Sequence, residues 1–357
     1  MKDAKKVDRM TSKERIKALI LNRPIDRVPF IPFFLGYLAI DNGISIYDFF
    51  TDLEKAFRAG IQTMKKYPWA SVRPAYDWAD HGAWEFGGKI GWPKDDARMT
   101  PFTPEPLITT PEELDHLPEP DPLKTDWFRR FHSFNEICTQ NGFSAQLPSA
   151  SIMSPMSSIV GSSNLMKWIL KYPDAVHSLA KKVLGFNMKV AEITLERFGS
   201  RNCNVTTQVP LESNSLLSPK TFESFCLPYI TELHGMYLES GVRGTMIHLC
   251  GNHRDNLKYW KNLPIPERTI FSIGDDMDLK ETGDFLGEKF VLAGNMSTTT
   301  LQFGTTEEVK EEVKRCLSQA KGRPGGFILM PACEYPPMAS SENLEALREA
   351  LLEYGFY

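Results

Sequence analysis

The heptapeptide Gly244-Thr245-Met246-Ile247-His248-Leu249-Cys250 joins an apolar run to two side chains that bind metal ions. The run from Gly244 is short and apolar, which favours a buried β-strand. His248 and Cys250 then follow just past the end of that strand. Because alternate side chains of an extended segment point the same way, both can reach a single ion.

Similar apolar runs recur on both sides of this heptapeptide. Eight of them read as strands, near residues 28–34, 69–75, 143–148, 203–208, 244–248, 269–273, 289–293 and 326–330. Amphipathic stretches typical of helices fall between several of them, at 173–198, 218–239, 306–320 and 341–353. Eight strands alternating with helices predict an α/β fold, a closed (β/α)₈ TIM barrel.

Three further segments complete the predicted architecture. Thr11 and Glu14 form a capping-box pattern that starts an N-terminal helix reaching to about Leu21. The interval 82–122 is rich in Pro, Gly and Trp, and we expect it to form an insertion over one end of the barrel. The apolar end 355–357 is expected to dock on the barrel, so that 1–357 forms one domain.

A third candidate ligand, Cys333, follows the apolar run 327–330, just past the end of the predicted eighth strand. Barrel enzymes place their chemistry at the carboxyl ends of the strands, so His248, Cys250 and Cys333 are expected to meet at one mouth. Two cysteines and one histidine with an open fourth position are typical of catalytic zinc. The alternative is that these are ordinary core residues.

Polar residues follow other predicted strands at the same mouth. Glu212 is a candidate fourth ligand and catalytic residue, the alternative being a solvated loop carboxylate. Asn214, Asp275 and Asn295 are candidates for binding the cofactor. Asp275 and its neighbour Asp276 are equally consistent with capping the helix that follows.

Composition limits the classes of partner and compartment. With 42% hydrophobic residues, 24% charged residues and a net charge of -4, nothing indicates a surface for nucleic acid. No apolar run approaches the ~20 residues that cross a bilayer, so we expect no membrane association and a cytoplasmic location. The other four cysteines are expected to be reduced core residues: Cys138, Cys203, Cys226 and Cys316.

Several motifs resemble the uroporphyrinogen decarboxylase superfamily over nearly the whole chain. They are Thr11-Ser12-Lys13-Glu14-Arg15 with Asp26-Arg27-Val28-Pro29, Phe222 to Tyr229, His248-Leu249-Cys250-Gly251, and Gly294-Asn295-Met296. The His-x-Cys and Cys333 set resembles the cobalamin-dependent methyltransferase branch, where it holds zinc. The decarboxylases use no metal and carry an arginine-rich N-terminal segment, of which only Arg27 is present here.

The resemblance implies methyl transfer involving cobalamin carried on a separate corrinoid-binding protein, since the chain has no Asp-x-His-x-x-Gly carrier motif. The favoured reaction takes the methyl group of a methyl aryl ether to cob(I)alamin, because aromatic residues near the insertion suit a planar ring. These are Tyr76, Trp78, Trp84 and Phe86, with His81 and Glu85 beside them. The alternatives are transfer from methylcobalamin to a small thiol such as coenzyme M or homocysteine, a metal-free decarboxylase, and a barrel that only binds a corrinoid or porphyrin.

Overall fold

The computed structural model describes residues 8–76, 78, 81–94 and 100–357. In this part of the chain six parallel strands form one sheet whose order follows the sequence. The strands are β1 (Ala145–Leu147), β2 (Cys203–Gln208), β3 (Gly244–Leu249), β4 (Ile270–Ile273), β5 (Val291–Met296) and β6 (Phe327–Pro331). Each strand pairs with the next one along the chain, as right-handed crossovers through helices produce.

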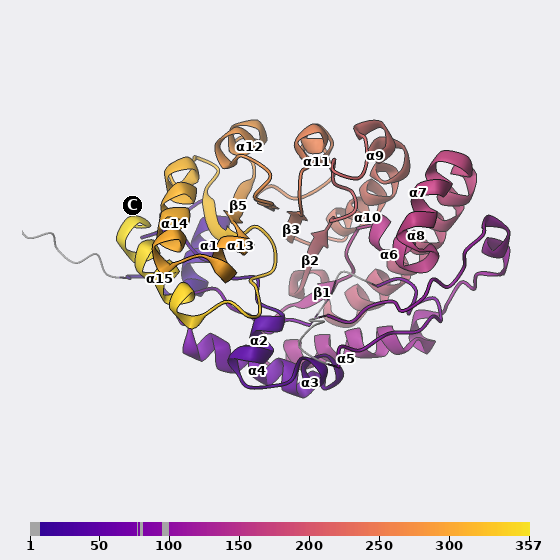
Figure 1. Cartoon of the computed structure of the whole chain (residues 1–357), viewed down its shortest axis with the longest axis horizontal. Helices are drawn as coiled ribbons and strands as arrows, with labels where there is room; N and C mark the ends of the chain where they lie inside the picture. Colours follow the sequence, from indigo (N-terminus) through magenta and orange to yellow (C-terminus); the bar gives the residue numbers. More distant parts are fainter. Residues whose placement is uncertain (1–7, 77, 79–80, 95–99) are drawn as a thin grey trace, which may run out of the picture.

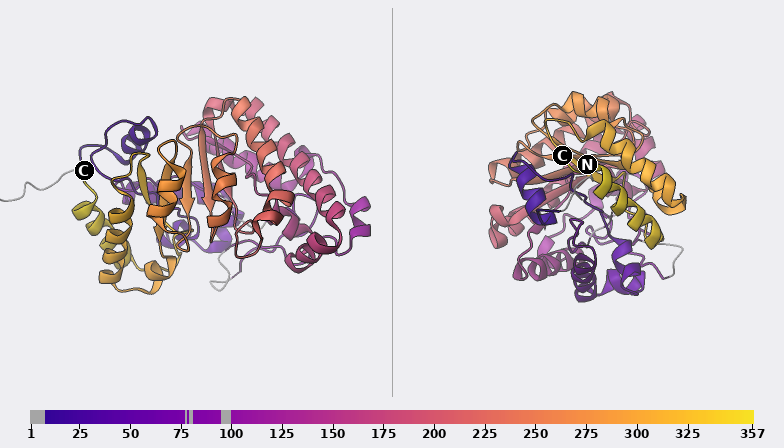
Figure 2. Two further views of the ribbon diagram at one scale, coloured as in Figure 1. Left: turned by 90° about the horizontal axis from the view of Figure 1, so that it is seen from above. Right: turned by 90° about the vertical axis from the view of Figure 1, so that its left-hand side faces the viewer.

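Helices cover the outer face of this sheet, as Figures 1 and 2 show. Those before and after β1 are α1 (Ser12–Ile20), α2 (Gly36–Asp41), α3 (Ile46–Thr51), α4 (Leu53–Lys66), α5 (Asp126–Gln140), α6 (Met153–Val160), α7 (Ser162–Lys171) and α8 (Pro173–Phe198). The later ones are α9 (Pro219–Phe225), α10 (Leu227–Glu239), α11 (Leu257–Lys261), α12 (Leu279–Leu286), α13 (Thr298–Phe303), α14 (Thr306–Ala320) and α15 (Ser341–Tyr354). The predicted barrel class is confirmed.

Two of the eight predicted strands are not regular strands. In 28–34 only Phe30 pairs, in parallel with Leu329 of β6, and the N–H of Ser71 donates to the Phe30 carbonyl at 2.8 Å. Prolines explain the shortfall, because Pro29, Pro32 and Pro74 have no N–H to give to a ladder. The two segments still extend the sheet beyond β6 and continue the curve of the barrel.

The helix predictions hold except at one break. α1 begins after the predicted capping box, in which Thr11 and Glu14 satisfy each other's backbone N–H groups. The stretch 218–239 was expected to be one helix but forms α9 and α10, which meet at Cys226. Pro228 accounts for the break, since a proline inside a helix removes a hydrogen bond and crowds the carbonyl four residues earlier.

The barrel interior holds both a packed cluster and an open cavity. Buried side chains from β5, β6 and α1 form a separate apolar cluster: Leu19, Val291, Ala293, Ile328 and Met330. β1 and β2 turn polar residues inward, and Gln146, Asn204, Thr206 and Gln208 line a cavity of about 710 Å³ together with Met330 of the cluster. The inside of this barrel is therefore only partly filled, whereas barrel interiors are usually filled throughout.

The insertion and the C-terminus contact the outside of this framework, and Trp84 of the insertion also lines the interior cavity. The described part of 82–122 contacts α6, where the N–H of Leu107 donates to the Ile159 carbonyl at 2.7 Å, and α8, where Lys182 pairs with Glu119. The tail docks as predicted, through an antiparallel bridge between Phe356 and Arg27. Among the described residues, every helix is too short or too polar to span a bilayer.

Candidate metal centre

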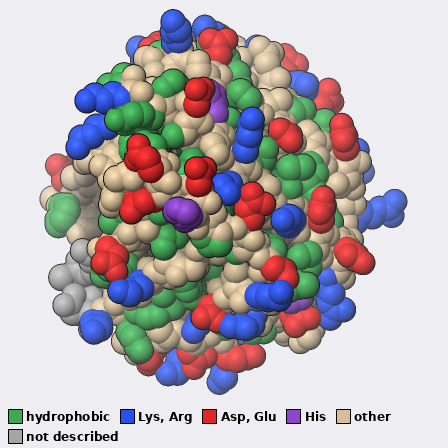
Figure 3. Space-filling view, turned by 90° about the vertical axis from the view of Figure 1, so that its right-hand side faces the viewer, with side chains coloured by type: hydrophobic (Ala, Val, Ile, Leu, Met, Phe, Trp, Pro, Cys, Tyr) green, Lys and Arg blue, Asp and Glu red, His purple; other side chains and the backbone are tan. Residues whose placement is uncertain are grey.

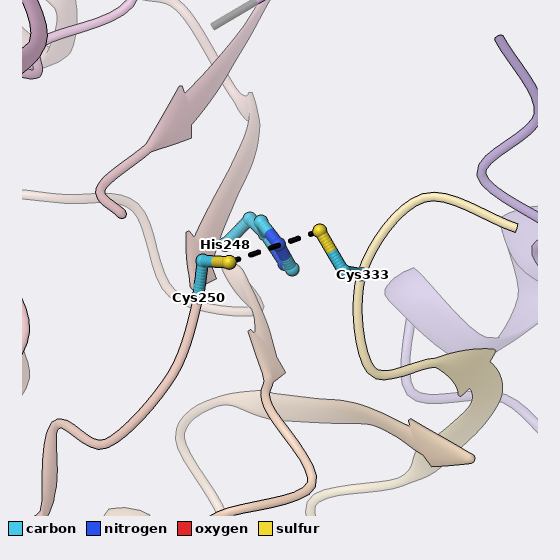
Figure 4. Close-up of side chains that lie close together, drawn as sticks. All are labelled: His248, Cys250 and Cys333. Carbon is cyan, nitrogen blue, oxygen red and sulfur yellow. Dashed lines mark hydrogen bonds between the residues drawn. The ribbon is translucent and has the colours of Figure 1, made fainter. Parts of the chain in front are cut away.

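Three side chains from two distant parts of the chain meet at the carboxyl end of the barrel (Figure 4). His248 lies near the end of β3, Cys250 follows it by two residues, and Cys333 lies in the loop after β6. One ligand atom of each lies within 4.8 Å of those of the other two, and the two sulfurs are 3.7 Å apart. The predicted convergence is present in the structure.

The imidazole of His248 is held in one orientation. Its Nδ1 lies 3.0 Å from the hydroxyl of Ser272, which occupies the paired position on β4. The ring of Phe33 packs edge-on against it, with centroids 5.2 Å apart. The remaining nitrogen, Nε2, is buried and has no hydrogen-bond partner among the described residues. Such a nitrogen is costly to bury unless another group takes its lone pair.

The two cysteines are partly buried and electrostatically linked. Their mutual hydrogen bond is the largest influence on the pKa of Cys333, lowering it to about 4, with His248 adding to the effect. The same contact is the largest influence raising the pKa of Cys250 above its ordinary value, and burial raises it further. At neutral pH the pair therefore readily supplies one thiolate, and a cation between the sulfurs would favour the second.

This donor set fits zinc. Two sulfurs, an imidazole with a free Nε2 and a partner on Nδ1 reproduce the arrangement in which a neighbouring group fixes the tautomer of a ligating histidine. His248, Cys250 and Cys333 would hold the ion, and the Nδ1 proton would then be donated to Ser272. No other such group of three His, Cys, Asp or Glu ligand atoms occurs in the described chain.

Glu212 lies outside this group. Its Oε1 accepts hydrogen bonds from the Ser151 hydroxyl at 2.8 Å and from the N–H groups of Ile152 and Met153 at 3.1 Å each. The carboxylate thus satisfies the amino end of α6. Burial raises its pKa despite these bonds, and Oε2 has no partner in the described chain. The geometry gives Glu212 a structural task and no place in the ligand set.

The three residues predicted to bind the cofactor differ in their surroundings. The Asn295 amide donates to the carbonyls of Gly274 and Met277, at 2.9 and 2.7 Å, which fixes the loop after β4. Asn214 Oδ1 accepts from the N–H of Asp255 at 3.0 Å and joins two rim loops. Asp275 is exposed, and its charge contributes to the raised pKa of Cys250, which places it beside the centre. Asp275 is therefore free to meet a ligand, and Nδ2 of Asn214 has no partner in the described chain.

The predicted aromatic residues form a cluster. Trp78 stacks on Trp84 at 6.2 Å, both pack against Trp92, and the Tyr76 hydroxyl donates to the Phe50 carbonyl. Phe86 is buried against α8. Three of the four predicted aromatics, Tyr76, Trp78 and Trp84, line the cavity inside the barrel, as does His81, whose Nδ1 lies 3.1 Å from Glu85. The cavity therefore has an aromatic wall.

The family model for uroporphyrinogen decarboxylase (URO-D) matches residues 11–354. The chain belongs to this family. Among its curated relatives are two methylcobamide:CoM methyltransferases, MtaA of Methanosarcina barkeri and MtbA of Methanosarcina acetivorans. Both are 27% identical, over 56% and 41% of this chain and 55% and 41% of their own lengths. A uroporphyrinogen decarboxylase of Geobacter sulfurreducens is 25% identical over 45% of this chain and 44% of its own length.

A solved structure gives the same fold for this member of the URO-D family. A methyltransferase from Methanosarcina mazei superposes with a TM-score of 0.77, covering 97% of this chain and 99% of the other at 20% identity. The curated relatives match over about half their length or less, so they do not fix the activity of the whole chain.

Arg27 bears on which activity of the URO-D family the chain carries. Its guanidinium is fully buried, pairs with Asp8 at 2.6 Å and donates to the Trp69 carbonyl. It does not line the interior cavity. The one arginine left from the pattern expected of a decarboxylase is therefore committed to holding the N-terminal segment.

The sequence analysis missed two residues that shape the metal centre. Ser272 and Thr269 are the two polar residues in the apolar run 269–273. A polar residue within a buried strand is a signal that the sequence analysis could have used. Phe33 carries no such signal, because its contact with His248 depends on an irregular backbone with φ of 52° that brings it over the mouth.

Proposed function

We propose that the protein is a zinc-dependent methyltransferase that moves a methyl group between a corrinoid and a small molecule. One observation carries the proposal: the unpartnered Nε2 of His248 faces two cysteine sulfurs at a barrel mouth. A structural zinc site normally has four protein ligands, whereas three ligands leave a position for a substrate. The similarity to methylcobamide:CoM methyltransferases supports the same reaction class.

The chain's own residues have defined tasks in this reaction. Zinc would supply a Lewis acid that stabilises negative charge on the substrate oxygen or sulfur that exchanges the methyl group. Ser272 keeps the imidazole of His248 turned so that Nε2 faces the sulfurs, and Phe33 blocks one edge of the ring. The cavity beside them, which Phe33, Met246 and Gln208 help to line, holds the small molecule away from bulk water.

For the small molecule we favour a methyl aryl ether, demethylated by cob(I)alamin carried on a corrinoid protein. The support is the aromatic wall and the volume of the cavity, about 710 Å³, which falls in the range of sites for ring-shaped ligands. A second candidate is a small thiol that receives the methyl group from methylcobalamin. The printed activity of MtaA and MtbA, methylcobamide:CoM methyltransferase, favours it.

Two measurements test this proposal. Elemental analysis should find about one zinc per chain. Incubation with cob(I)alamin and methoxyarenes, and separately with methylcobalamin and thiols, should change the cobalt absorption spectrum in one of the two pairings. A protein without zinc that leaves both spectra unchanged would not be a corrinoid methyltransferase. Decarboxylation of uroporphyrinogen by the metal-free protein would support the remaining alternative.

A further inference from the structure

The interior cavity begins beside the metal centre, where Phe33 and Gln208 neighbour His248 and line it, and runs to the opposite end of the barrel. Gly244, Met246 and His248 alternate on the inward side of β3, and the cavity reaches from Met246 down to Gly244. From His248 to Gly244 is four residues of strand, or about 13 Å. Asn204 and Thr206 on neighbouring β2 line the same stretch. The cavity therefore leads from one end of the strands to the other.

Basic side chains surround the lower, amino-terminal end of this passage. Met246 pairs with Ile270, so Gly244 stands opposite Arg268, with Arg243 next to it and Lys13 contributed by α1. The described residues that line the whole cavity include five Lys or Arg and no Asp or Glu. By contrast, Figure 3 shows acidic and basic side chains interspersed over one outer face of the molecule. The described lining of the passage is positive, whereas the protein as a whole has a net charge of -4.

The guanidinium group of Arg268 lacks part of its possible hydrogen bonds. Its Nη2 donates to the Leu19 carbonyl at 2.8 Å and Nη1 to that of Glu288 at 3.3 Å. Its Nε is buried and has no partner in the described part of the chain. Burial lowers the pKa of Arg268, and among the described residues no carboxylate forms an ion pair with it. An anion at this end of the passage would relieve both deficits.

We propose that the amino-terminal end of the barrel is an entrance for the small substrate, where Lys13, Arg243 and Arg268 capture an amphiphilic anion. The inference rests on the proposed function, because the metal centre faces the carboxyl mouth and a corrinoid protein has to cover that mouth to deliver its cobalt. A small substrate that enters from the other end can exchange while the mouth is covered. Its apolar body fits between the apolar cluster and the polar wall of β1 and β2.

The basic end of the passage lies too far from the metal centre for one small molecule to contact both. The basic end of the strand at Gly244 lies about 13 Å from His248, which exceeds the length of a one-ring methoxyarene carboxylate or a two-carbon thiol sulfonate. One such molecule cannot touch both ends at once. The basic end therefore raises the local concentration of anions, and the interior carries them onward.

Binding of para-methoxybenzoate to the zinc-loaded protein, measured by calorimetry without any corrinoid, tests the entrance. Its uncharged counterpart para-methylanisole should bind about tenfold more weakly or worse. Reversing the charge of the two exposed rim residues, Lys13→Glu with Arg243→Glu, should weaken para-methoxybenzoate about tenfold and remove most of the salt dependence. Equal binding of the two compounds, or binding unchanged by the reversal, would overturn the proposal.

A steric variant tests the passage itself. Asn204→Phe fills the space over Gly244 and should weaken para-methoxybenzoate by about tenfold or more, because it occupies the cavity that the ring needs. Asn202→Phe is the matched control, since Asn202 is exposed two residues earlier. Anion binding that survives Asn204→Phe but disappears in Cys333→Ser would place the ligand at the metal alone and refute the entrance.

An assay of methyl transfer distinguishes a failure of this inference from a failure of the proposed function. In Asn204→Phe, kcat/KM for the small substrate should fall about tenfold, whereas KM for the corrinoid protein and the zinc content stay unchanged. An unchanged kcat/KM would show that substrate enters by the mouth. If the wild-type protein transfers no methyl group but binds the anion as predicted, the proposed function fails and the anion site stands.

Discussion

Removing the hydroxyl that orients His248 should weaken zinc binding while leaving the fold in place. Ser272 is fully buried, and its Oγ lies 3.0 Å from Nδ1. In Ser272→Ala the ring keeps its packing against Phe33 but loses the group that fixes its tautomer and rotation. Nε2 then spends less time facing the sulfurs of Cys250 and Cys333, so the ion loses part of one ligand.

The expected magnitude follows from the single bond removed. Loss of a partner that orients a ligating histidine typically costs tenfold to a hundredfold in metal affinity, or about 1.4 to 2.7 kcal/mol. The same substitution should lower the free energy of unfolding of the metal-free protein by only about 1 kcal/mol, the usual net value of one hydrogen bond.

Competition with a chromogenic chelator measures the zinc affinity, and urea unfolding measures the stability. Thr207→Val is the control, because the Thr207 hydroxyl on β2 makes a similar contact away from the metal, 3.1 Å from Nε2 of the buried His234, and also accepts from the N–H of Ala150 at 3.4 Å. It should cost at least as much stability and leave zinc affinity unchanged. If Ser272→Ala binds zinc as tightly as the wild type, the imidazole is positioned by packing alone and the reasoning is wrong.

Four other substitutions give distinct outcomes. Cys250→Ser and Cys333→Ser should each release the zinc and abolish methyl transfer with little change in the unfolding temperature of the metal-free protein, measured by elemental analysis and calorimetry; unfolding on metal loss would indicate a structural site instead. Burial raises the pKa of Glu212 above its ordinary 4.5, so the folded protein retains a proton that the unfolded chain has released, and stability falls as the pH rises through that window. Glu212→Gln should remove this part of the pH dependence of stability. If the free energies of unfolding of the two proteins, measured with denaturant, change in parallel from pH 4.5 to 8, the prediction is wrong. Arg27→Ala removes a buried guanidinium together with its hydrogen bonds to Asp8 and to the Trp69 carbonyl, and should lower the free energy of unfolding by about 2 to 3 kcal/mol without changing KM for the small substrate, whereas a raised KM would return Arg27 to a substrate-binding role.

The sequence predicted the elements that depend on local pattern. The capping box at Thr11, the helix 173–198 and the buried run before His248 were recognisable, because hydrophobic period and capping chemistry act over a few residues. It misjudged elements in which proline interrupts such a pattern, at 28–34 and at Pro228. There the apolar spacing continues while the backbone hydrogen bonds cannot.

The candidate ligands were visible for a related reason. A metal centre at a barrel mouth uses residues at or just after the carboxyl ends of strands, so His248, Cys250 and Cys333 stood out by position. Glu212 follows β2 and Asn295 lies near the end of β5, but the structure uses their side chains to satisfy the amino end of α6 and the carbonyls of the loop after β4. Position after a strand does not reveal which backbone groups nearby still need a partner.

The sequence by itself determined the alternation of strands and helices and the chemical character of the metal ligands, since both follow from residue types at short spacing. Only the tertiary structure decided that Cys333 comes within 3.7 Å of Cys250 across 83 residues, that Ser272 orients the imidazole, and that a cavity stays open inside the barrel. The physical reason is that ring closure and side-chain packing depend on all strands at once. The sequence of one strand does not show how much space the other strands leave in the barrel interior.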